Sequence, residues 1–172
     1  VSVCSYLTII MFEPHSIYSM RLAKKGELIT HHKDKAVLTL MNMDSIVETD
    51  FLTVRPNMDL GEMVKIISKS FRNQFPVVDV GGELIGMVVL DDIRNIIFRQ
   101  ELYHRFHVEG FMKVPKTRIV NTDSMEEVME KFDTTGAWNL PVVDREGKYI
   151  GMVSKSKMLN TYRQVMVDFS EE

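Results

Sequence analysis

The chain has 172 residues, of which 45% are hydrophobic and 26% are charged, and its formal net charge is −3. This length and composition predict a globular protein of one or two domains with a sizeable core. The negative charge excludes a strongly basic nucleic-acid-binding protein, so we expect no nucleic-acid partner. Cys4 is the only cysteine, which excludes a disulfide framework and a cysteine metal site and favours a reducing compartment.

The first twelve residues are apolar and are followed by Glu13-Pro14. They are too few to cross a bilayer, which takes about 20 residues, and they lack the charged leader of a signal peptide. Two interpretations fit. The stretch packs on the domain as an N-terminal strand or helix, or it is the cytoplasmic end of a transmembrane helix that begins upstream. Arg21, Lys24 and Lys25 follow it, as the positive-inside rule would place them.

Further along, the chain contains one segment twice. Residues 76–88 and 141–153 lie 65 positions apart and are identical at nine of thirteen positions, with Pro-Val-Val-Asp at the start and Ile-Gly-Met-Val at the end. In each copy Pro suits the first residue of a strand, Val-Val packs on a pleated surface, and Asp with a following Gly supplies a turn. Each copy therefore predicts a β-hairpin. The predicted strands are 76–80, 84–90, 141–144 and 149–154.

The flanks of the two hairpins repeat at the same spacing. Before each hairpin, apolar residues at i, i+3, i+4 and i+7 predict an amphipathic helix. These residues are Leu60, Met63, Val64 and Ile67 in the first copy and Met125, Val128, Met129 and Phe132 in the second. Asp59 and Ser124 are the predicted N-caps. A short strand is predicted ahead of each helix, at 53–55 and 118–120, and a second helix after each hairpin, so the unit is β-α-β-β-α.

Residues 98–107 are expected to extend the second helix of the first copy. His104 and His107 lie three apart in this segment, and Glu101 lies three before His104. Such a pair binds a metal only as part of a set of three or four ligands with a supporting shell. We therefore expect a solvated helix face and no metal site.

At its repeated segments the chain resembles a tandem pair of CBS domains, a Bateman module, over residues 43–167. The resemblance implies an α+β fold in which two β-α-β-β-α units pack with pseudo-twofold symmetry. The domains would be 43–107 and 108–172, behind a mostly helical linker at 1–42. The sequence has no phosphate loop, nucleophile elbow or metal-ligand cluster. We therefore expect a regulatory protein and no enzyme.

The residues ahead of the CBS-like segment point to a particular family of parent proteins. Residues 12–18, Phe-Glu-Pro-His-Ser-Ile-Tyr, and residues 22–38 are similar to the segment after the last membrane helix of prokaryotic ClC-type chloride channels and transporters. This favours the truncated-helix interpretation and implies a cytosolic regulatory and dimerisation module at the cytoplasmic face of the cell membrane. Its partners would be the membrane domain and a second copy, bound through CBS helices. The alternative is a CBS regulatory region of a soluble enzyme, such as a nucleotide dehydrogenase or a sugar-phosphate isomerase.

In the CBS family, adenine nucleotides often bind in clefts between the units. The ligand motif runs Gly, two apolar residues, Ser or Thr, two residues, then Asp. Each repeat here keeps half of it. The first has Asp92 but Val89 in place of the hydroxyl, and the second has Ser154 but Lys157 in place of the carboxylate. The carboxylate would accept hydrogen bonds from the ribose, and the hydroxyl would meet a phosphate at a helix N-terminus.

The resemblance thus implies two candidate clefts. The first would use Asp92 for the ribose, with Thr117, Trp138 and Asn139 around the base and Trp138 stacked on adenine.

The second candidate cleft would use Ser154 and Lys157 with Thr53, Arg72 and Asn73, although the ClC relatives that bind ATP have an aromatic residue at the position of Arg72 and Asp at that of Lys157. We expect no required cofactor, and ATP, ADP or AMP as a regulatory ligand centred on Asp92.

Overall fold

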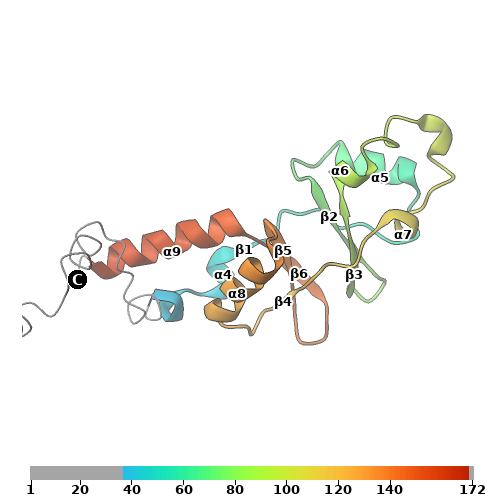
Figure 1. The fold of residues 1–172 in the computed structure, drawn as a ribbon. Helices are drawn as coiled ribbons and strands as arrows, with labels where there is room; N and C mark the ends of the chain where they lie inside the picture. The colour runs from blue at the N-terminus through green and yellow to red at the C-terminus, as the bar shows by residue number, and fades with distance from the viewer. Residues whose placement is uncertain (1–36, 171–172) are drawn as a thin grey trace, which may run out of the picture. The chain divides into compact units, whose positions relative to one another are not determined.

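The computed structural model describes residues 37–170 (Figure 1). Predictions for residues 1–36, including the interpretation of the first stretch, lie outside the described residues. In chain order the elements are α4 (Met43–Ile46), β1 (Val47–Glu48), α5 (Leu60–Ile67), β2 (Gln74–Val78), β3 (Leu84–Val89), α6 (Leu90–Ile93), the 3-10 helix η1 (Gln100–Leu102), α7 (Val108–Phe111), β4 (Ile119–Val120), α8 (Met125–Thr135), β5 (Asn139–Val143), β6 (Tyr149–Ser154) and α9 (Lys155–Ser170).

The two repeated segments form antiparallel hairpins, as predicted, from β2 with β3 and from β5 with β6. Both hairpins carry a register irregularity within the Val-Val pair. Both turns contain a glycine with positive φ, 85° at Gly82 and 87° at Gly147. Only glycine adopts this backbone conformation without strain, which explains why the two copies share it.

The first helix of each unit begins where the sequence predicts. Asp59 caps α5 and Ser124 caps α8, and each takes part in a capping box with the glutamate at the third helical position. In such a box the cap side chain accepts the N3 N–H while the glutamate accepts the N-cap N–H, so two unpaired donors are satisfied. The apolar stripes face inward, since Met63 and Phe132 are fully buried.

Each hairpin gains a parallel neighbour from its own unit. In the second unit β4 runs parallel to β5, with Ile119 opposite Val142. In the first unit the corresponding contact is a single bridge between Val54 and Val77. The predicted strand at 53–55 is therefore reduced to one bridging residue, while the predicted strand at 118–120 forms as β4.

The other edge of each hairpin pairs with the chain segment that leads into the opposite hairpin. β1 lies ahead of the first hairpin yet pairs with β6, with Glu48 opposite Met152. Lys113 lies ahead of the second hairpin yet bridges Met87 in β3. These two pairs differ by the same 65 residues, so the units exchange their leading segments symmetrically. The first sheet contact of each leading segment is with the other unit.

Glycine in the repeated Ile-Gly-Met-Val makes room for the exchanged segments. A Cβ atom on Gly151 would lie 2.6 Å from Val47 Cγ1 and 2.7 Å from the carbonyl oxygen of Glu48. A Cβ atom on Gly86 would lie 2.8 Å from Met112 Sδ. Because separations this short are repulsive, both positions need glycine for the crossing segment to pack closely.

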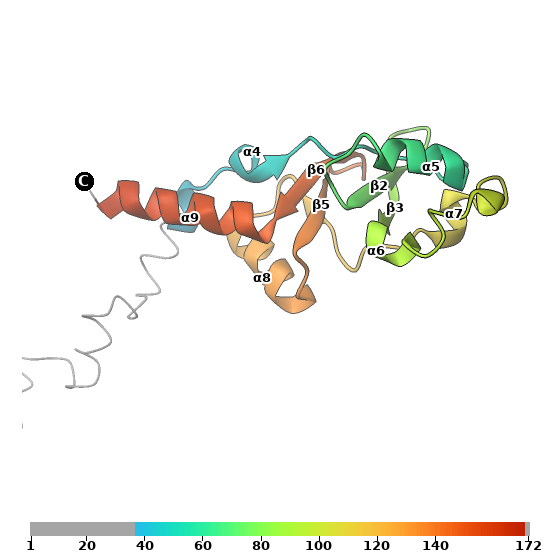
Figure 2. The ribbon, with the colours of Figure 1, turned by 90° about the horizontal axis from the view of Figure 1, so that it is seen from above.

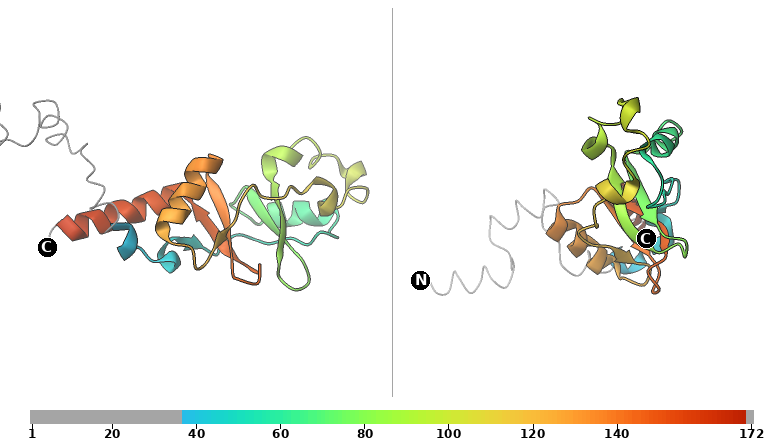
Figure 3. Two further views of the ribbon diagram at one scale, coloured as in Figure 1. Left: turned by 60° about the horizontal axis from the view of Figure 1, so that its bottom comes forward. Right: turned by 90° about the vertical axis from the view of Figure 1, so that its right-hand side faces the viewer.

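The turns of the two hairpins, the green and the orange loop in the left view of Figure 3, are joined by a bridge between Glu83 and Lys148. Leu84 N–H donates to the Gly147 carbonyl at 3.0 Å, and Tyr149 N–H donates to the Gly82 carbonyl at 2.9 Å. These bonds are each other's symmetry equivalents. A buried cluster beside them joins the two hairpins through Phe51, Leu84, Met87, Val143 and Met152. The predicted α+β fold of two pseudo-symmetric units is confirmed.

A separate core lies on the far side of each hairpin. In the second unit α8 and α9 cover β5 and β6, and α4 lies beside α9 (Figure 2). Phe132 and Met158 are buried in this core. In the first unit α5 and the turns after α6 cover β2 and β3, with Met63 and Phe75 at the centre.

The helix expected at residues 98–107 is wrong, because this segment forms turns and the short η1. Its carbonyl groups are used elsewhere. The Tyr103 carbonyl accepts from Gly61 N–H at 3.4 Å, and the Phe106 carbonyl accepts from Leu60 N–H at 2.9 Å. The segment thus satisfies donors at the start of α5, which an extended helix would leave unpaired. The second helix is also shorter than predicted in the first unit, where α6 ends at Ile93.

Candidate functional site

Two clefts are predicted to bind a nucleotide, and each is named by one charged residue. The Asp92 cleft comprises Asp92, Thr117, Trp138 and Asn139. The Arg72 cleft comprises Thr53, Arg72, Asn73, Ser154 and Lys157.

The Arg72 cleft is occupied by the protein's own ion cluster. Arg72 Nη2 lies 2.8 Å from Asp50 Oδ1 and 3.2 Å from Glu48 Oε1. The guanidinium carbon lies 4.5 Å from the centroid of the Phe51 ring, so Arg72 also makes a cation–π contact. The hydrogen bonds to Asp50 raise the pKa of Arg72. Because Glu48 belongs to β1, this cluster links the first unit to the second sheet.

Two polar atoms around this cluster are buried without a hydrogen-bond partner. They are Glu48 Oε2 and the hydroxyl of Tyr149. Burial, and secondarily the charge of Asp50, raises the pKa of the Tyr149 phenol, which therefore stays neutral. Because two carboxylates surround one guanidinium, the cluster is net negative and disfavours a phosphate.

The other residues of the Arg72 cleft serve local structure. Ser154 Oγ accepts the Lys157 N–H at 3.1 Å, so the hydroxyl is used at the start of α9. The Asn73 carbonyl accepts from Leu90 N–H at 2.8 Å. The side chains of Thr53, Asn73 and Lys157 are exposed.

The Asp92 cleft is more open. Asp92 Oδ1 lies 2.8 Å from Lys113 Nζ, and the two side chains are 37% and 67% exposed. Trp138 is 73% exposed, although its carbonyl accepts from Lys155 N–H at 2.8 Å. Asn139 pairs across the hairpin with Ser154, a residue predicted for the other cleft. Among residues 37–170, no hydrogen bond or ion pair joins Asp92 to the other members of its cleft.

Thr117 borders a pocket of about 360 Å³ with Lys116 and Arg118. The other lining residues are Leu84, Ile85, Val114 and Pro115. The pocket therefore has an apolar wall from the start of β3 and a basic wall from the segment before β4. This composition suits an anion that carries an apolar group.

Lys113 and Arg118 were not predicted as site residues, although the 65-residue spacing identifies them as equivalents of residues near the other cleft. That spacing relates Glu48 to Lys113 and Thr53 to Arg118. It also relates Arg72 to Ala137. The glutamate and the arginine that pair in the Arg72 cleft are thus replaced by a lysine and an alanine, so the Asp92 cleft has no equivalent of this ion pair.

The histidines that were considered as metal ligands have a local role. His104 Nδ1 lies 2.8 Å from Asp59 Oδ2. The Glu62 backbone N–H, followed by His104, lowers the pKa of Asp59. In the described part of the chain, no group of three or more His, Cys, Asp or Glu residues is arranged to hold a metal ion. Between residues 37 and 170, no helix is both long and apolar enough to cross a membrane.

Both units match the CBS domain family, at residues 43–99 and 108–163. The match covers more than half of the chain, and the chain belongs to this family. CBS domain pairs are regulatory modules. Each of the two matched ranges contains one copy of the repeated segment.

Relatives and solved structures agree with this assignment. A CBS domain-containing protein of Dictyostelium discoideum is 25% identical over 70% of this chain and 90% of its own length. The inosine-5'-monophosphate dehydrogenase of Methanocaldococcus jannaschii is 24% identical over 82% of this chain but only 29% of its own length. The chain therefore spans less than a third of that enzyme.

Three solved structures share the fold. CbpB in complex with c-di-AMP has a TM-score of 0.66 at 14% identity, covering 81% of this chain and 96% of its own. CBSX2 in complex with AMP has a TM-score of 0.60 at 19% identity, covering 72% and 97%. The CBS domain of a membrane protein from Sphaerobacter thermophilus has a TM-score of 0.63 at 20% identity, covering 81% and 97%.

Proposed function

We propose that this chain is a regulatory module that binds one adenine nucleotide, in the Asp92 cleft. The observation that carries the proposal is the contrast between the clefts. Asp92 and Lys113 pair with each other at an open surface, whereas Arg72 is already bound to two carboxylates and a phenyl ring. A ligand entering the Asp92 cleft has fewer internal contacts to displace.

The pseudo-twofold equivalence suggests how the Asp92 cleft is assembled. Arg72 reaches Glu48 in the other cleft, so their equivalents Ala137 and Lys113 are expected to face each other here. Alanine leaves open the space that the arginine fills. The neighbouring Trp138 would then stand beside the Asp92–Lys113 pair, close enough to stack on a base.

Each group has a distinct role in binding. Asp92 would accept hydrogen bonds from the ribose hydroxyls, and Lys113 would turn from Asp92 toward a phosphate, a charge-assisted contact. Trp138 would stack on adenine, an interaction worth about 1–3 kcal/mol for a base on an aromatic ring. Thr117 and Asn139 would border the base. ATP, ADP and AMP share all these features, and the AMP and c-di-AMP complexes of the two structural neighbours support an adenine ligand.

Regulation would follow from the exchanged strands. A ligand that holds Asp92 of the first unit and Trp138 of the second favours one arrangement of the pair over others, and it shifts the population toward that state. β1 pairs with β6 of the second sheet. A change in the arrangement of the pair would therefore reach the parent protein through the residues that precede β1.

The parent protein is proposed to be a ClC-type chloride channel or transporter, with this chain as its cytosolic module. The similarity of residues 12–18 and 22–38 to the segment after the last ClC membrane helix supports this proposal. A soluble enzyme is the second candidate, because inosine-5'-monophosphate dehydrogenases are among the relatives. The sequence upstream of Val1 distinguishes them. Apolar spans of about 20 residues favour the channel, and a catalytic domain favours the enzyme.

A homodimer formed through CBS helices is proposed as the assembled state. On α9, Leu159 is 36% exposed and Val167 is 56% exposed. Apolar residues on an outer helix face are typical of a contact surface. Light scattering at a mass of twice 19.9 kDa is expected, and a monomer at all concentrations would contradict the dimer.

Calorimetry with ATP, ADP and AMP tests the nucleotide proposal. One nucleotide per chain is expected to bind, and Asp92→Ala is expected to weaken binding at least about tenfold, because one charge-assisted contact is worth about 1.5–3 kcal/mol. Lys157→Ala is the matched control at the equivalent position of the other cleft and should change little. No heat at millimolar ligand, or full affinity in Asp92→Ala, would contradict the proposal.

A further inference from the structure

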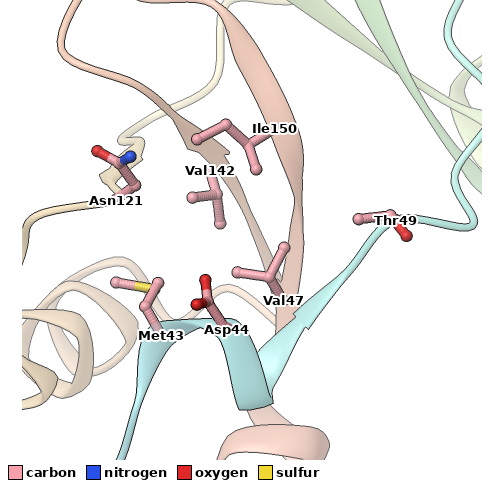
Figure 4. Close-up of a pocket in the computed structure, with 7 residues that line it drawn as sticks. All are labelled: Met43, Asp44, Val47, Thr49, Asn121, Val142 and Ile150. Carbon is pink, nitrogen blue, oxygen red and sulfur yellow. The ribbon is translucent and has the colours of Figure 1, made fainter.

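A pocket of about 310 Å³ lies under α4 on the outer side of the second sheet, at the small end of the range of about 300–1,000 Å³ for small-molecule sites. It is lined by Met43, Asp44, Val47, Thr49, Asn121, Val142 and Ile150 (Figure 4). Val142 belongs to the core beneath α8 and α9, whereas its neighbour Val143 belongs to the cluster between the hairpins. None of the residues assigned to the Asp92 cleft lines this pocket, so the two are separate.

The equivalent helix of the first unit, α7, makes contacts that α4 lacks. There α7 is held down by two backbone bonds, from Val108 N–H to the Met58 carbonyl at 2.9 Å and from Glu109 N–H to the Pro56 carbonyl at 3.0 Å. In the second unit the Asp44 N–H donates instead to Asn42 Oδ1 at 3.2 Å. α4 therefore lacks the bond that its equivalent makes to the loop.

A shorter side chain also keeps the pocket open. The 65-residue spacing relates Val47 to Met112. Met112 packs against the first core and over Gly86. Valine at the same place in the second unit reaches less far, so the space that the methionine fills is left empty.

The lining determines the chemistry of a ligand. Val47 and Ile150 supply an apolar wall beside the fully buried Val142, and the carboxylate of the exposed Asp44 points toward Val142 (Figure 4). Within the described residues this carboxylate has no hydrogen-bond or ion-pair partner, and no lysine or arginine lines the pocket. A carboxylate at the edge of an apolar surface favours a cation attached to an apolar group.

We propose that this pocket binds a small branched alkylammonium ligand, with its ammonium group on Asp44 and its alkyl group against Val47 and Ile150. The proposal is independent of nucleotide binding, because the pocket shares no residue with the Asp92 cleft.

Methyl NMR of the whole chain tests it with three probes of equal shape: isopentylammonium, isovalerate and isopentanol. Isopentylammonium is expected to shift the methyl signals of Val47, Val142 and Ile150 to saturation, at least tenfold more tightly than either other probe. Asp44→Asn should weaken binding about tenfold. Glu109→Gln, the same change at the equivalent position of α7, should leave it unchanged.

Val47→Met reproduces the first unit and is expected to abolish binding without loss of thermal stability. Equal affinity for isopentanol or isovalerate would overturn the proposal, since the pocket would then not select a cation. Unchanged affinity in Asp44→Asn, or no saturation by about 10 mM isopentylammonium, would also overturn it.

Discussion

The two clefts of this CBS pair occupy equivalent places and differ in what fills them. In one, Arg72 is bound by Asp50 and Glu48. In the other, the equivalents of Arg72 and Glu48 are Ala137 and Lys113, which cannot form this ion pair. The duplication thus preserved the hairpins and the exchanged segments while the clefts diverged. The symmetric parts carry the fold, and the asymmetric parts are where different binding properties are expected.

Gly151→Ala and Gly86→Ala compare the two exchanged leading segments, and they should give the largest changes in stability. The new Cβ at 151 meets the backbone oxygen of Glu48, which cannot move without displacing β1, whereas the Cβ at 86 meets only side-chain atoms of Met112, with the flexible Sδ closest. We expect a loss in the free energy of unfolding of about 3 kcal/mol for Gly151→Ala and about 1 kcal/mol for Gly86→Ala. Urea unfolding measures both. Equal losses would show that the exchanged segments are equally adaptable.

Arg72→Ala and Lys113→Ala compare the two charged groups. Removing Arg72 leaves the largely buried Glu48 unpaired, so we expect a destabilisation of about 1–2 kcal/mol. Lys113 and Asp92 are exposed, so Lys113→Ala should cost less than about 0.5 kcal/mol. Thermal unfolding of both variants at pH 7 measures the difference. A costlier Lys113→Ala would contradict the assignment of the ion cluster to the Arg72 cleft.

Tyr149→Phe removes a hydroxyl that is buried without a partner. Because an unsatisfied buried polar group is unfavourable, we expect a gain of about 1 kcal/mol. The raised pKa of Tyr149 adds a pH dependence. The unfolded phenol ionises near pH 10 while the folded one does not, so the stability of the native chain should fall as the pH rises above this value. The variant should lose that part of the alkaline decline. An unchanged alkaline profile would argue against a buried phenol.

The stabilities of the two capping boxes should differ by the smallest amount, and only at acidic pH. Asp59 has a lowered pKa, so its contribution is present above its unfolded pKa and is lost as the pH falls through the lower folded value. Ser124 does not titrate. Between pH 6 and about pH 3 the Glu62 amide should therefore lose more of its protection than the Glu127 amide, as measured by hydrogen exchange. Asp59→Ser should remove the difference, and its persistence in that variant would assign it to another cause.

Local chemistry explains what was predicted from sequence. The hairpins follow from Pro-Val-Val-Asp and a positive-φ glycine, and the caps follow from Asp59 and Ser124, all within a few neighbouring residues. The exchange of leading segments was not predicted, because the pairing of Lys113 with Met87 depends on how the units assemble. The turns at 98–107 were missed for the same reason, since their carbonyls bond to a distant helix.

The candidate site was predicted less completely than the fold. The two half-motifs directed attention to Asp92 and Ser154, but they did not show that Arg72 is engaged by Asp50. Only the assembled edge of β1 brings these side chains together. Comparing the copies position by position would have identified Lys113, since a lysine stands where the first copy has Glu48.

Trp138 is the only tryptophan of the chain and is proposed to stack on the base in the Asp92 cleft, so its fluorescence tests that assignment. Titration with ATP, ADP or AMP is predicted to quench it to saturation at one nucleotide per chain, with the response lost in Asp92→Ala and retained in Lys157→Ala. Calorimetric binding that leaves the Trp138 emission unchanged would contradict the proposed cleft.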